Sequence, residues 1–154
     1  SKLPASRLEL DLPAGERPVL FVDRAQVRIV LDEVLENAVQ AVEANQGRIR
    51  IAYEADIAGP WTVPEFISAG GQTDKPPAGW VEIVIEDTGC GINPTVLQRI
   101  FDPFYSHRQA GRGRGLGLAR AHRIVEAHGG RIWAASQPDQ GACFHITLPQ
   151  IASL

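Results

Sequence analysis

The order of helical and strand-like segments is the feature that most limits the folds open to this chain. Apolar residues recur at helical spacing over residues 24–44 and again over residues 116–128. Five other segments are predicted strands, and they occupy residues 8–12, 48–54, 80–87, 131–136 and 142–149. Strands and helices do not alternate regularly along the chain, so a doubly wound sheet is disfavoured. The order predicts a two-layer α/β sandwich.

Local signals set the expected boundaries of these elements. Asp23 is a good N-cap for the first helix, with Gln26 completing a capping box, and Gly47 is expected to close that helix in a left-handed conformation. Residues 8–12 alternate apolar and acidic, as a half-buried strand does. A short helix is expected from Pro94 to about Ile100. Residues 56–79 are predicted to be a long loop inserted into one domain of 154 residues.

Composition narrows the class of protein. The formal net charge is -3, and no basic face suggests a nucleic-acid partner. No apolar run approaches the roughly 20 residues of a membrane span. Cys90 and Cys143 are too few for a disulfide framework. We therefore expect a cytoplasmic domain, from a parent protein whose membrane anchoring is left open.

The stretch "GRGRGLGLA", residues 111–119, places four glycines at alternate positions before a helix. A P-loop would need a lysine here, but the only lysines are Lys2 and Lys75. The spacing of a dinucleotide fingerprint is also missing. Glycines that lead into a helix still let backbone N–H groups approach phosphate oxygens closely. The alternative interpretation is a hinge loop with solvated arginines.

A second candidate site lies on the first helix. Glu33, Asn37 and Gln40 are spaced so that they share one polar face. The amide oxygen of an asparagine is a suitable ligand for Mg²⁺, which keeps several waters and takes other ligands from phosphates. Taken alone, the same pattern also fits a plain solvated helix face.

A third candidate site follows the clearest strand, "WVEIVIED". Asp87 ends this strand, and Gly89 and Gly91 come next. A carboxylate there can accept a hydrogen bond from the amino group of adenine, whereas it repels the corresponding oxygen of guanine. The glycines allow a flat base to lie against the backbone. The alternative is a tight turn capped by the aspartate.

Together, "LDEVLENAVQA", "DTGCGI", "IFDPFYSHR" and "GRGRGLGLA" resemble, in order and spacing, the N, G1, F and G2 boxes of sensor histidine kinases. The resemblance covers residues 23–149. It implies the Bergerat ATP-binding fold of the GHKL superfamily, a mixed and mainly antiparallel sheet with three helices on one face. It also implies that residues 101–114 form a lid over ATP, with Phe101 and Phe104 as its aromatic anchors.

The resemblance also implies roles for individual residues. It makes Asn37 the Mg²⁺ ligand, with Glu33 reaching the ion through water, and it makes Asp87 the reader of adenine. Glu33, Asn37 and Arg108 are the catalytic candidates. The other implied nucleotide contacts are Gln40, Ala41, Gly89, Gly91, Ile92, Phe104, Arg108, Arg112, Gly113, Arg114, Gly115, Leu116, Gly117 and Leu118. Three positions depart from the pattern: Arg108 replaces a common lysine, Ala142 a threonine and Glu33 an asparagine.

The function implied is transfer of the γ-phosphate of Mg-ATP to a histidine of a dimerisation and phosphoacceptor domain outside this chain. A homodimeric parent and a downstream response regulator are the implied partners. None of the four histidines has the acidic neighbour expected of the phosphoacceptor, so we expect no autophosphorylation by this chain alone. One alternative is a GHKL clamp that hydrolyses ATP with Glu33 as general base. Another is a nucleotide-sensing regulator without phosphotransfer.

Overall fold

The computed structural model describes residues 7–15, 17–57, 79–105 and 116–151. Its helices and strands are, in chain order, β1 (Leu8–Asp11), β2 (Val19–Leu20), α1 (Arg24–Glu43), β3 (Ile49–Ile57), β4 (Gly79–Asp87), α3 (Pro94–Leu97), α4 (Gly117–Ala127), β5 (Arg131–Ser136) and β6 (Ala142–Ile151).

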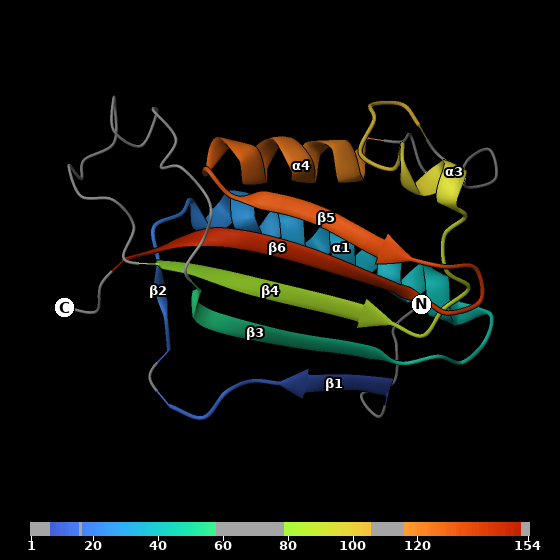
Figure 1. The fold of residues 1–154 in the computed structure, drawn as a ribbon, viewed down its shortest axis with the longest axis horizontal. Coiled ribbons are helices and arrows are strands. Elements are labelled where there is room, and N and C mark those ends of the chain that lie inside the picture. Colours follow the sequence, from blue (N-terminus) through green and yellow to red (C-terminus); the bar gives the residue numbers. More distant parts are fainter. Residues whose placement is uncertain (1–6, 16, 58–78, 106–115, 152–154) are drawn as a thin grey trace.

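The strands form one six-stranded sheet in the order β1-β3-β4-β6-β2, with β5 also paired to β6. β1 pairs with β3 in parallel, and the other described pairs are antiparallel. Figure 1 shows α1, α3 and α4 together on one side of this curled sheet. The predicted two-layer fold, with its mixed and mainly antiparallel sheet, is confirmed.

The core lies between the helices and the covered face of the sheet. Phe144 and Ile146 of β6 are fully buried, and so are Val34 of α1 and Val125 of α4. Strand alternation explains this pattern, because residues two apart on β6 face the same side. The core therefore joins both long helices to the central strands.

The first helix begins as predicted and ends differently. The Asp23 side chain accepts a hydrogen bond from the backbone N–H of Gln26 at 3.0 Å, which confirms the N-cap. At the other end, the left-handed residue is Gln46, with φ 55°, and not Gly47. A Cβ on Gly47 would lie 2.7 Å from the Thr88 hydroxyl oxygen. The glycine is thus required by close packing against the turn after β4.

Other expected boundaries also change. β1 is a strand, but all four of its residues are exposed, so the half-buried prediction is wrong. β2 was not predicted, because two residues carry no periodic signal. α3 ends at Leu97, earlier than expected. The predicted insertion is shorter at both ends, since β3 runs to Ile57 and β4 begins at Gly79. The rest of it lies outside the described residues.

No helix among the described residues is both long and apolar enough to span a membrane.

Candidate nucleotide-binding site

Asp87 is the most unusual polar residue of the described chain. It ends β4, and only 2% of its surface is exposed. Its Oδ1 accepts a hydrogen bond of 2.8 Å from the backbone N–H of Gly89, while its buried Oδ2 has no partner among the described residues. Burial raises the pKa of the Asp87 carboxyl, and the backbone N–H groups of Gly89 and Ala142 partly oppose that rise. An unpartnered buried carboxylate oxygen is costly unless a ligand supplies a donor.

Glycines let three backbone segments close around Asp87. A Cβ on Gly89 would lie 2.5 Å from the carbonyl oxygen of Ala41, and one on Gly141 would lie 1.9 Å from that of Asp87. Gly91 and Gly141 also have positive φ angles, 71° and 75°. A side chain at any of these positions would push the backbone apart. Both predicted glycines of this site are therefore held in place by close backbone contacts.

The last part of α1 packs against the loop that follows β4. The Ala41 carbonyl oxygen accepts a hydrogen bond of 3.3 Å from the backbone N–H of Cys90, so α1 is joined directly to the loop after β4. Asn37 lies one turn earlier and is 7% exposed. The expectation of a solvated helix face is thus wrong for Asn37, which is buried.

Two predicted residues of this region lie differently from the expectation. The Gln40 amide donates a hydrogen bond of 2.8 Å to Glu36, which was not among the predicted site residues. Ile92 is 6% exposed within the main core, and its backbone N–H donates to the Ser136 hydroxyl at 2.8 Å. Ile92 therefore anchors the loop that carries Gly89 and Gly91.

A second set of contacts joins Glu33 to the start of α4. A Cβ on Gly117 would lie 2.1 Å from Oε2 of Glu33, so the Glu33 carboxylate rests against the first residue of that helix. Its other oxygen, Oε1, forms an ion pair with Arg120, one turn further along α4. Glu33, Asn37 and Ala41 follow each other at one-turn intervals, about 12 Å of α1 in all. α1 thus connects the surroundings of Asp87 to the start of α4.

The residues flanking Gly117 have different surroundings. Leu116 is the N-cap position of α4 and is 40% exposed, with no side-chain cap. Leu118 is partly buried and packs against the core. Gly117 thus lies at the candidate site because it contacts Glu33, whereas Leu118 packs α4 against the core.

The two aromatic residues of the predicted lid anchor also differ from each other. Phe101 packs edge-on against Phe144, with ring centroids 6.4 Å apart, and lies 5.5 Å from the His122 ring. Phe104 has a φ of 64° and is 78% exposed. Phe101 is therefore anchored in the core, whereas the Phe104 side chain is exposed.

The remaining predicted contacts lie outside the described residues. They are Arg108, Arg112, Gly113, Arg114 and Gly115. Of the predicted lid, residues 101–105 are described and form turns.

Sequence reasoning missed two residues that shape the site. Arg120 pairs with Glu33 although 87 positions separate them, and nothing in the sequence signals such a pair. Gly141 holds the Asp87 backbone in place, and its position before a strand predicts only a turn. Residues that meet from distant segments leave no local pattern.

The chemistry of the site matches a nucleotide better than a metal cage. Among the described residues, no group of three or more His, Cys, Asp or Glu side chains could hold a metal ion. Mg²⁺ does not need such a cage, because it takes ligands from phosphates and water and needs few from the protein. The start of α4, against which Glu33 rests, favours anions such as phosphates.

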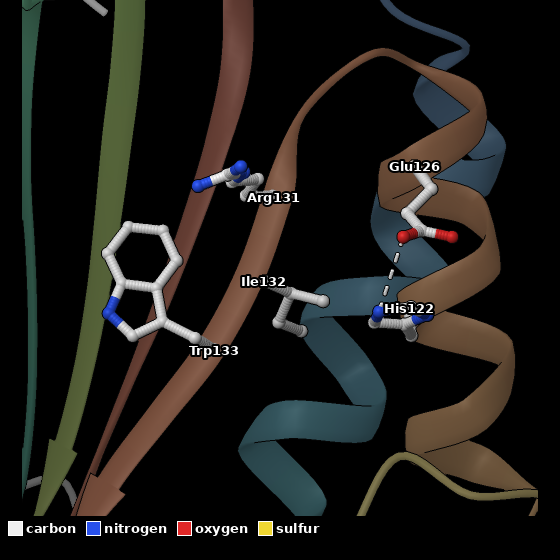
Figure 2. Close-up of a pocket in the computed structure, with 5 residues that line it drawn as sticks. All are labelled: His122, Glu126, Arg131, Ile132 and Trp133. Carbon is white, nitrogen blue, oxygen red and sulfur yellow. Dashed lines mark ion pairs between the residues drawn. The ribbon is translucent and has the colours of Figure 1, made fainter. Parts of the chain in front are cut away.

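A pocket of about 480 Å³ lies elsewhere, between α4 and β5. Figure 2 shows His122 and Glu126 on α4, with Ile132 of β5 pointing toward them. Arg131 and Trp133 complete its lining. None of the predicted site residues that the structure describes is among these lining residues.

Comparison with known proteins places this geometry in a family. Residues 22–152 match the family described as histidine kinase-, DNA gyrase B- and HSP90-like ATPase. The chain is 39% identical to the signal transduction histidine-protein kinase AtoS of Escherichia coli over 92% of its own length. It is 34% identical to the adaptive-response sensory kinase SasA of Prochlorococcus marinus over 96%. The chain spans only 19% of AtoS and 35% of SasA.

Among solved structures, full-length ShkA in complex with AMPPNP covers 95% of this chain with a TM-score of 0.68 and 27% identity, and the match spans 26% of ShkA. The mycobacterial sensor histidine kinase MprB matches with a TM-score of 0.63 and 25% identity, over 96% of this chain and 85% of the MprB chain.

Proposed function

Because the chain belongs to the family of histidine kinase-, DNA gyrase B- and HSP90-like ATPases, we propose that it binds Mg-ATP and donates the γ-phosphate to a histidine on a separate phosphoacceptor domain. The observation that carries this proposal is the buried Asp87 carboxylate, whose Oδ2 has no partner among the described residues and which lies where glycines let backbone segments pack closely. The resemblance to sensor histidine kinases supports a histidine as the group that accepts the phosphate.

Adenine recognition follows from the state of Asp87. The amino group of adenine would donate to Oδ2 and give that buried oxygen the hydrogen bond it lacks. Guanine would place an acceptor oxygen there, so two acceptors would face each other without a proton between them. Gly89 and Gly91 let the loop after β4 pack closely against the backbones of Ala41 and Gln137, which fixes the position of Asp87 for this contact.

Phosphate binding belongs to the middle of α1, where Glu33 meets the start of α4. We assign the phosphates to the start of α4, where unpaired N–H groups favour anions, and Mg²⁺ to Asn37. Bound Mg²⁺ would neutralise phosphate charge during transfer. The contribution of the protein is then mainly positioning and charge stabilisation as the acceptor imidazole attacks and ADP leaves. Arg108 remains a proposed phosphate contact.

The partners belong to the rest of the parent protein. We propose a homodimer with its own dimerisation and phosphoacceptor domain, and a downstream response regulator. His122 lies on α4, His128 at its C-cap and His145 within β6. None of these three histidines lies early in a helix with an acidic residue directly after it. Incubation with labelled ATP should therefore leave this chain alone unlabelled.

The test of the proposal is Asp87→Asn. The amide presents a donor or a weaker acceptor to the adenine amino group, so we expect the affinity for an ATP analogue to fall about 10- to 100-fold. Isothermal titration calorimetry measures the affinity, and circular dichroism checks that the variant is folded. Unchanged affinity in a folded variant would refute the adenine site.

Glu33→Gln separates the kinase from the ATP-hydrolysing clamp. A clamp needs Glu33 as general base, so the variant should lose ATP hydrolysis by about 100-fold or more. A kinase with the same substitution should keep phosphotransfer to a supplied acceptor domain. Hydrolysis and transfer are measured on the same preparations of both proteins. If Glu33→Gln loses hydrolysis and the wild type transfers no phosphate to the acceptor domain, the result favours the clamp.

A further inference from the structure

Arg120 of α4 forms an ion pair with Glu33 of α1. Its Nη2 forms an ion pair with Glu33 Oε1, and the side chains are 57% and 27% exposed. The other carboxylate oxygen rests against Gly117. The pair therefore bridges α1 and the first turn of α4 at the place where the proposed function puts phosphates.

The charge of Glu33 matters because of this location. The first N–H groups of α4 have no side-chain cap, and the N-terminal end of a helix attracts anions. A carboxylate resting there competes with any anionic ligand, and an unneutralised carboxylate repels the phosphates of a nucleotide. With Arg120 bound to it, Glu33 contributes no net charge as part of the pair.

We propose that Arg120 is a positioning residue for the nucleotide phosphates: it neutralises the Glu33 carboxylate, so that a polyphosphate can approach the same helix start. This inference rests on the proposed function. It gives Arg120 no contact with the reacting atoms, because it acts through Glu33. Its characteristic consequence is that the effect of removing Arg120 grows with the number of phosphates on the ligand.

The experiment measures the affinities of the 154-residue chain for adenosine, ADP and a non-hydrolysable ATP analogue, in Mg²⁺, by calorimetry. For Arg120→Ala we expect about fivefold weaker binding of the ATP analogue, because the unneutralised Glu33 carboxylate repels the phosphates. The affinity for ADP should fall less than that for the ATP analogue, and the affinity for adenosine should not change. Arg123→Ala is the matched control, because it removes an exposed arginine from the same helix and should leave all three affinities near wild type.

Two further variants separate charge from packing. Adding Glu33→Gln to Arg120→Ala removes the unneutralised carboxylate and should restore most of the lost affinity. Arg120→Lys keeps the charge and should bind almost as wild type does. A merely structural role predicts the reverse, since the double variant would then bind no better than the single one.

The outcomes distinguish the two proposals. If the wild-type chain binds neither ADP nor the ATP analogue, the proposed function fails, and this inference fails with it. If the wild type binds but Arg120→Ala weakens adenosine as much as the ATP analogue, or weakens neither, the role of Arg120 is overturned while the nucleotide site stands.

Discussion

The two ends of the candidate site are built in different ways. Around Asp87, backbone meets backbone: Gly89 lies against the Ala41 carbonyl, and Gly141 against the carbonyl of Asp87 itself. At the start of α4, the contact is made by two partly exposed charged side chains, Glu33 and Arg120. The adenine end is thus part of the folded core, whereas the phosphate end can be rearranged without unfolding.

This difference fits the ligands proposed for each end. A base is rigid and flat, and a preformed pocket recognises it with little loss of entropy on binding. A phosphate chain with Mg²⁺ changes its charge and contacts during transfer, so side chains that can move are suited to it. Substitutions of the closely packed glycines at the proposed adenine end should therefore affect mainly stability, and substitutions of Arg120 at the proposed phosphate end mainly affinity.

Gly141→Ala should have the largest effect on stability. The new Cβ would lie 1.9 Å from the Asp87 carbonyl oxygen, at a residue with a φ of 75°. Strain and displacement together should lower the free energy of unfolding by about 2–4 kcal/mol. Urea unfolding measures it. Gly79→Ala is the control, because its nearest contact would be 3.3 Å away; equal effects of the two changes would contradict a tightly packed adenine end.

Asp87 should make stability depend on pH. Burial raises the pKa of its carboxyl above the ordinary 3.8, so the folded protein holds the proton more tightly than the unfolded chain does. The stability that this adds is fully present below pH 3.8 and is lost as the pH rises through the folded pKa. As the pH rises through this range, the free energy of unfolding of the wild type should fall relative to that of Asp87→Asn, which has no titrating group at this position. A stability difference that stays constant with pH would contradict this.

Arg120→Ala should have the smallest effect on stability. Exposed ion pairs contribute about 0.2–1 kcal/mol, and salt screens them. We therefore expect a change of that size in urea unfolding, smaller still at high salt. A loss as large as that of Gly141→Ala would mean that the phosphate end is as much a part of the core as the adenine end.

The sequence predicted those parts of the fold whose signals are local. Asp23 caps α1 through a residue three positions away, and the strand predicted over residues 80–87 matches β4 to within one residue. The helix end was misassigned because Gln46, rather than Gly47, takes the left-handed conformation. A glycine in the sequence can mark either a positive φ angle or a lack of space for a side chain. Only the packing in the folded structure shows which of the two applies, and at Gly47 it is the lack of space.

The candidate site divides in the same way. Asp87, Gly89 and Gly91 could be predicted as a unit because they are consecutive or nearly so. Glu33 was found, but its partner Arg120 was not, because their contact depends on how α4 packs against α1. Phe104 was expected at the site from its motif position, yet it is 78% exposed.

The pairing of β3 with β4 has a consequence for engineering this domain. Ile49 pairs with Asp87 at the nucleotide end, and Ile57 pairs with Trp80 at the other end of the same ladder. At about 3.4 Å per residue, the two ends lie roughly 25 Å apart. The register to β6 fixes β4 independently of the connection between β3 and β4. A tag or reporter inserted between Ile57 and Gly79 would thus enter at the end of the ladder remote from Asp87, which makes this connection the first choice for such a fusion.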